Sequence, residues 1–110
     1  MEIDVTGRHV HVTAALKQYA VEKVKKFEKY ALKIEVVRVI MAVEKIRQIV
    51  EIVVSGKNLR FTAKAQNEDM YAAFDNCFAK LQLQLSRQHD RVKDHKSRQI
   101  SKAARADKRE

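Results

Sequence analysis

The stretch Asn67-Glu68-Asp69-Met70-Tyr71-Ala72-Ala73-Phe74-Asp75 combines a helix start with the first turn of an apolar face. Asp69 or Asn67 can accept a hydrogen bond from the free amides of the first turn, and negative charge there suits the helix dipole. Apolar residues then recur at helical spacing, at Met70, Ala73, Phe74, Cys77, Phe78, Leu81, Leu85 and Val92. This pattern predicts a long helix with one packed face and Lys80, Arg87 and Arg91 beside it.

Working outward toward the N-terminus, the chain alternates between strand-like and helix-like patterns. Residues 2–8 alternate like a half-exposed strand, and Thr13 is a suitable N-cap for a helix running to about Tyr30. The predicted apolar side of that helix comprises Leu16, Tyr19, Ala20, Val24, Phe27 and Tyr30. Three further strands are predicted at 35–44, 46–55 and 59–66, with turn-forming residues between the last two.

The order strand, helix, three strands, helix predicts an α+β fold, β-α-β-β-β-α. The economical packing is a four-stranded, mostly antiparallel sheet with both helices on one face. The 110 residues suit one small domain, which we place at 1–95. From Asp94 onward few apolar residues remain, so residues 96–110 are predicted to be a basic, disordered tail.

The charge balance favours an anionic partner. The chain has 23 Lys and Arg against 14 Asp and Glu, a formal net charge of +9. Residues 1–85 carry 14 basic and 10 acidic side chains, whereas residues 86–110 carry 9 and 4, so more than half of the excess lies near the C-terminus. Such a distribution is typical of proteins that bind nucleic acid, an anionic membrane surface or an acidic protein.

The basic residues of the two predicted helices are the candidate binding site. We predict that their basic margins border one groove that binds phosphates with little sequence reading. Lys23 projects near Tyr19, Phe27 and Tyr30, where its alkyl stem can cover apolar surface. Lys25 and Lys33 are interpreted instead as solvated surface residues. The candidate RNA-binding residues are Lys23, Lys26, Lys29, Lys80, Arg87, His89, Arg91 and Lys93.

Signals for catalysis, metals or membranes are weak. The only glycines are Gly7 and Gly56, which excludes a glycine-rich phosphate loop. His9 and His11 are interpreted as an exposed pair rather than a metal site, because no ligand set accompanies them. Cys77 is the only cysteine, so no internal disulfide can form and a reducing, cytoplasmic location is expected. No apolar run approaches the roughly 20 residues needed to span a bilayer. We therefore expect a non-enzymatic protein without cofactor or metal.

Several segments resemble the ribosome hibernation-promoting factor family, which includes the ribosome-associated translation inhibitor. The resemblance covers about residues 1–95, because separate segments agree in order and spacing. It rests on Thr6-Gly7-Arg8-His9-Val10-His11-Val12-Thr13, on Lys23, Lys26, Phe27 and Glu28, and on Glu68-Asp69-Met70-Tyr71-Ala72-Ala73-Phe74-Asp75 followed by Lys80-Leu81 and Gln84-Leu85.

The resemblance implies a fold related to double-stranded RNA-binding domains and a cytoplasmic partner, the small ribosomal subunit. It implies binding to ribosomal RNA between head and body, overlapping the mRNA path and the aminoacyl and peptidyl tRNA positions, so that translation stops in stationary or stressed bacteria. The chain resembles the short type, which lacks a dimerisation domain. We therefore expect a monomer when free, and any ribosome dimers would need another factor such as ribosome modulation factor.

Two positions depart from the family pattern. Leu83 stands where members commonly carry Arg, and His89 where Lys is frequent, which would make that contact depend on pH. Two alternatives remain beside ribosome hibernation. One is a general double-stranded RNA-binding module, and the other is a protein-interaction modulator of transcription.

Overall fold

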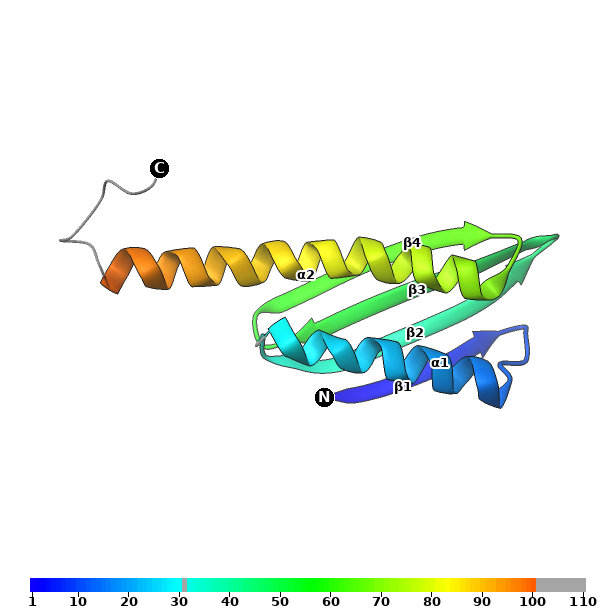
Figure 1. The fold of residues 1–110 in the computed structure, drawn as a ribbon. Coiled ribbons are helices and arrows are strands. Elements are labelled where there is room, and N and C mark those ends of the chain that lie inside the picture. Colours follow the sequence, from blue (N-terminus) through cyan, green and yellow to red (C-terminus); the bar gives the residue numbers. More distant parts are fainter. Residues whose placement is uncertain (31, 101–110) are drawn as a thin grey trace.

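The computed structural model describes the backbone of residues 1–30 and 32–100 and the side chains of residues 1–30 and 32–91. The predicted order of elements is confirmed, and the strand boundaries agree with the prediction within one residue. The elements are β1 (Glu2–Arg8), α1 (Ala14–Val24), the 3-10 helix η1 (Lys25–Tyr30), β2 (Ile34–Glu44), β3 (Arg47–Gly56), β4 (Leu59–Asn67) and α2 (Met70–Ile100) (Figure 1).

The four strands form one mixed sheet in the order β1-β2-β3-β4. β1 runs parallel to β2, whereas β2–β3 and β3–β4 are antiparallel pairs. Both helices cover the same face, and α2 continues well past the end of the sheet (Figure 1). The predicted α+β architecture is therefore confirmed. In the part of the chain that the structure describes, no helix covers the other face of the sheet.

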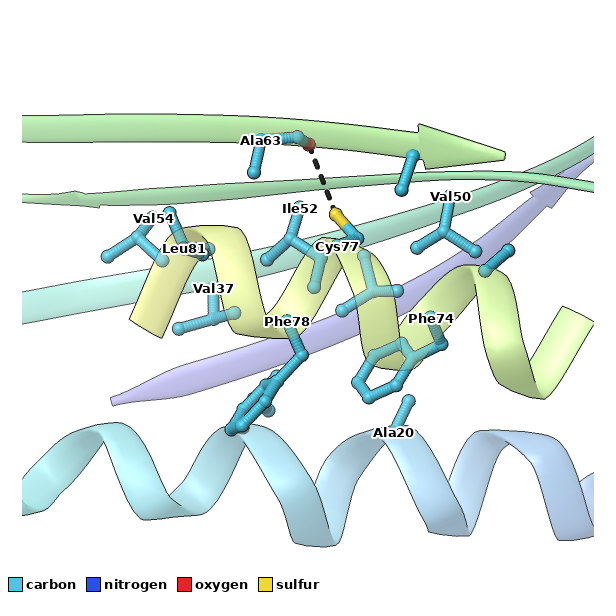
Figure 2. Close-up of a cluster of buried hydrophobic side chains, with 14 of the residues drawn as sticks. Ala20, Val37, Val50, Ile52, Val54, Ala63, Phe74, Cys77, Phe78 and Leu81 are labelled. Atoms are coloured by element: carbon cyan, nitrogen blue, oxygen red, sulfur yellow. Dashed lines mark hydrogen bonds between the residues drawn. The ribbon is translucent and has the colours of Figure 1, made fainter. Parts of the chain in front are cut away.

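The core lies between the helices and the covered face of the sheet. Cross-strand rows such as Val39, Ile52 and Ala63 follow the strand register and are buried. The small side chain of Ala63 allows α2 to approach β4 closely, and Figure 2 shows Cys77 directed at this strand. The ring of Phe78 stacks on that of Phe27 with centroids 5.0 Å apart. Each such aromatic burial stabilises the fold by roughly 1.5–3 kcal/mol.

Both helices begin at side-chain caps. The Thr13 hydroxyl accepts a hydrogen bond from the Leu16 amide at 3.1 Å. At α2 the Asp69 carboxylate accepts from the Ala72 amide at 3.0 Å, and Asn67 accepts from the Asp69 amide at 3.1 Å. Asp69 is therefore the N-cap of α2, and the hydrogen bond from its amide to Asn67 holds Asp69 in position.

The first helical segment differs from the prediction of one α-helix reaching Tyr30. It changes at Lys25 to a 3-10 helix that ends at Tyr30. In a 3-10 helix, residues three apart align on one side. Val24, Phe27 and Tyr30 are all buried, and continued α-helical geometry would spread them over about 120°. Burial of this triplet explains the tighter winding.

The second helix extends further than predicted. It ends at Ile100, whereas regular structure was expected to fade from Asp94. The residues from Ser86 onward include no Pro or Gly and many Arg, Lys and Gln, which favour helix. A division at residue 95 into domain and tail stays a prediction, and residues 101–110 lie outside the described part of the chain.

Candidate nucleic-acid interface

Lys23 lies at the junction of α1 and α2, where the sequence placed it. Its side chain is half-buried, and its Nζ is 5.5 Å from the ring centroid of Tyr19 and 5.7 Å from that of Phe78. The alkyl stem thus covers aromatic surface while the ammonium benefits from two ring faces. This arrangement restricts the ammonium to the boundary between the two helices.

A hydrogen bond joins the helices beside Lys23. The Tyr19 hydroxyl donates to the Asp75 carboxylate at 2.6 Å, and the Tyr71 ring packs edge-on against Tyr19 at 5.0 Å. The hydrogen bond to Asp75, with a smaller effect of desolvation, raises the pKa of Tyr19 to about 12. The part that Asp75 plays in positioning α1 has no local signal in the sequence, because its partner is 56 residues away.

The lysines of η1 are exposed. Lys26 and Lys29 both reach solvent, and the Nζ of Lys29 lies 5.3 Å from the Tyr30 ring centroid. We call Lys23, Lys26 and Lys29 the α1–η1 row. α-Helical spacing predicts one band for Lys25, Lys26, Lys29 and Lys33, but the first three belong to the 3-10 helix η1 and Lys33 lies beyond its end.

Lys80 lies on the flank of α2 that faces away from α1. Its ammonium donates to the backbone carbonyl of Lys64 at 2.9 Å, and one turn later Gln84 donates to the carbonyl of Thr62 at 3.0 Å. Both acceptors belong to β4, the edge strand of the sheet. The prediction that Lys80 borders the groove between the helices is therefore wrong.

Arg87 and Arg91 share the flank of Lys80. They follow Lys80 by seven and eleven residues, a spacing that returns to one side of an α-helix, and both are exposed. We call Lys80, Arg87 and Arg91 the β4-edge row. For these arginines too, the predicted inter-helix groove is wrong. The physical reason is that α2 packs over β3 and β4, so this flank overhangs the sheet edge instead of meeting α1.

His89 lies on the opposite flank of α2. Its Nδ1 is 2.9 Å from the carbonyl oxygen of Tyr30, at the end of η1. Because a carbonyl only accepts, Nδ1 carries the proton and Nε2 is the nitrogen left for another partner. Lys93 belongs to α2, but its side chain lies outside the described residues. Leu83 is 51% exposed, so it occupies a surface position on α2.

The chemistry offered by these residues is binding of anions. A cleft of about 670 Å³ beside β4 is lined by two lysines, Lys64 and Lys80, by one carboxylate, Glu44, and by uncharged residues. Among the side chains of residues 1–30 and 32–91, no three of His, Cys, Asp or Glu gather as a metal site would require. In the same residues no helix has the length and apolarity to cross a membrane.

The family of this chain follows from comparison with known proteins. The model of the sigma 54 modulation protein / S30EA ribosomal protein family matches residues 3–93. The chain belongs to this family. The matched segment includes both basic rows, His89 and the backbone position of Lys93.

The chain is also similar to named relatives and to solved structures. The chain is 41% identical to the ribosome hibernation promoting factor of Pseudomonas putida, with 92% of each chain covered. It is 36% identical to that of Salmonella typhimurium, covering 86% of this chain and 100% of the relative. A ribosomal subunit interface protein from Coxiella burnetii superposes with a TM-score of 0.75 at 28% identity, covering 80% of this chain and 97% of the other. The N-terminal domain of Thermus thermophilus Protein Y gives 0.71 at 25% identity, covering 79% and 98%.

Proposed function

We propose that this protein is a ribosome hibernation factor that binds the small ribosomal subunit at the mRNA and tRNA channel. It acts in the cytoplasm as a non-enzymatic inhibitor of translation and stabilises inactive ribosomes in stationary phase or under stress. The observation that carries the proposal is the presence of two basic rows, exposed except for the half-buried Lys23, on a fold whose relatives are named ribosome hibernation promoting factors.

The binding energy in this proposal comes from ribosomal RNA phosphates. Each surface Lys or Arg that neutralises a phosphate releases condensed counterions, so affinity falls steeply with salt. In this proposal α2 enters the mRNA and tRNA channel. The α1–η1 row lies beside one flank of α2 and the β4-edge row lies on the other flank, so RNA is contacted on both sides of α2. Occupying the aminoacyl and peptidyl positions in this way excludes mRNA and tRNA by volume, and no chemical step is needed.

Cosedimentation with purified small subunits tests the proposal. We expect binding that weakens as salt rises, is displaced by tRNA with mRNA, and accompanies inhibition of a cell-free translation reaction. Salt-insensitive association would contradict phosphate binding. A free RNA duplex that competes as strongly as the subunit would favour general double-stranded RNA binding, and capture of transcription proteins without ribosomal components would favour the transcription alternative.

Ribosome pairing is a separate question for this function. We expect the chain alone to leave ribosomes unpaired, and ribosome dimers to form only when ribosome modulation factor is added. Sucrose-gradient profiles of ribosomes with each factor alone and with both distinguish these cases. Dimers formed by this chain alone would contradict the expectation.

A further inference from the structure

A third group of cations lies at the turn between β3 and β4. The Lys57 amide donates to the Lys33 carbonyl at 3.2 Å, which ties this turn to the segment between η1 and β2. Gly56 makes the contact possible, since a Cβ there would lie 1.9 Å from the Lys33 carbonyl oxygen. The side chains of Lys33, Lys57 and Arg60 are all exposed. We call these three residues the turn cluster.

The turn cluster adjoins the β4-edge row. Lys80 contacts residue 64 and Gln84 contacts residue 62, so α2 and β4 run antiparallel to each other. Four helical residues rise about 6 Å and two strand residues span about 6.7 Å, so this correspondence continues along the edge. Arg87, three residues after Gln84, is therefore at about the level of Arg60.

The turn cluster also adjoins the α1–η1 row. Lys33 follows the end of η1 by three residues, and its carbonyl contacts the β3–β4 turn directly. The neighbouring Tyr30 carbonyl contacts His89 of α2 at 2.9 Å. From these contacts we place Lys29, Lys33, Lys57, Arg60 and Arg87 around the end of the sheet that holds the β3–β4 turn. Figure 1 shows that α2 projects past this end of the sheet.

We infer that the turn cluster joins the two basic rows into one continuous surface that binds the sugar–phosphate backbone of RNA. The inference rests on the proposed function and adds a contact outside both helices. Within the described residues, the only ion pair found is Asp4 with Arg38, so the turn cluster's cations are available for phosphates. Because the backbone under Lys33 and Lys57 is already hydrogen-bonded, little backbone entropy is lost on binding.

RNA fits this surface better than an acidic protein for two reasons. The surface curves around the end of a sheet, and Leu83 is the one exposed large apolar side chain that the described residues place on α2 beside Arg87. Protein interfaces usually depend on a larger apolar centre. The surface also presents cations that are spaced apart on three different elements. This spacing suits the successive phosphates of an RNA backbone better than one compact patch of carboxylates on a protein.

A pair of charge reversals of equal size tests the inference. Lys57→Glu with Arg60→Glu changes the turn cluster, and Lys45→Glu with Arg47→Glu changes the β2–β3 turn at the other end of the sheet. Each pair changes the net charge by the same amount. We expect the first pair to weaken small-subunit binding about tenfold or more and to reduce the salt slope by about 1.5, and the control pair to weaken it less than about threefold.

The outcomes separate the inference from the function on which it rests. If wild-type protein fails to bind small subunits, the proposed function fails. If wild-type protein binds but both reversed pairs weaken it alike, only net charge matters and the turn-cluster surface is refuted. Circular dichroism and thermal melting identify a folding defect, and Lys33→Gln with Lys57→Gln repeats the test with a milder change.

Directed cleavage identifies the partner class. An iron–EDTA group attached at Asn58→Cys, in the turn cluster's own turn, should cut ribosomal RNA in the bound subunit. The same group at Ile46→Cys is the matched control on the other turn, where Ile46 is 73% exposed. The native Cys77 is buried and does not compete for the reagent. No RNA cleavage from residue 58, despite normal subunit binding, would overturn the inference.

Discussion

At the scale of single residues, Cys77 behaves as a core group. Its thiol is buried and donates to the Ala63 carbonyl at 3.2 Å (Figure 2), and burial raises the pKa of Cys77 to about 12. At pH 8 the thiol therefore stays protonated and shielded. We expect a thiol reagent to modify the folded protein at least about 100-fold more slowly than protein in guanidinium, because modification requires opening of the core. Equal rates would show that α2 does not cover β4 as described.

The raised pKa of Tyr19 predicts how the free energy of unfolding changes at alkaline pH. Its pKa is raised from 10.0 to about 12, chiefly by the hydrogen bond to Asp75. The protonated phenol is thus favoured in the folded state, and its stabilisation is complete below pH 10 and lost as pH rises toward 12. Tyr19→Phe should cost less than about 1 kcal/mol at pH 8, since the hydrogen bond that it removes is exposed to solvent. Urea unfolding at pH 8 and pH 11 should show a smaller alkaline loss for Tyr19→Phe than for wild type, and equal losses would contradict the assignment.

At the scale of elements, α2 protects the open edge of the sheet. Lys80 and Gln84 occupy the outward carbonyls of Lys64 and Thr62 on β4. Exposed strand edges invite pairing with another chain. The double variant Lys80→Ala and Gln84→Ala should therefore self-associate at concentrations where wild type is monomeric. Analytical ultracentrifugation measures this, with Asn76→Ala on the same flank as control, and an unchanged monomer would show that the two contacts are dispensable.

The features of a helix or strand can be predicted from the sequence when their cause lies within a few residues. Asp69 and the apolar stripe from Met70 to Leu85 predict α2 correctly, because caps and periodicity act within a few residues. The 3-10 winding of η1 does not follow from local pattern, since it depends on Tyr30 being buried together with Phe27. The sequence also does not predict on which side of α2 Lys80 lies. A helical pattern defines two flanks beside the apolar face, but it does not show which of them meets α1.

The same distinction applies to the candidate site. The position of Lys23 is predictable only in part, because Tyr19, one of the two rings that its ammonium faces, is on its own segment, whereas the other, Phe78, is on α2. The turn cluster was not predicted, because Lys33 and Lys57 are 24 residues apart and meet only through strand pairing. A useful signal was present in Gly56, the residue that allows this close approach.

At the scale of the whole molecule, packing and charge are divided along the chain. The described core ends in α2 at Leu85, yet α2 continues to Ile100. Residues 96–110 contain six basic and two acidic side chains. The folded body is therefore stabilised mainly by residues before this segment, whereas the segment supplies a substantial share of the positive charge. Stability and RNA affinity should respond differently when it is removed.

A chain ending at His95 tests this division. We expect its melting temperature to stay within about 3 °C of wild type, because none of the described core contacts is removed. Its affinity for small subunits should fall, and the slope of log affinity against log salt should decrease by at least about 1, because at least one or two phosphate contacts are lost. Melting by circular dichroism and cosedimentation across a salt series measure the two effects on one preparation. A large fall in melting temperature would show that residues 96–110 belong to the folded domain, and an unchanged salt slope would show that their charges do not contact RNA.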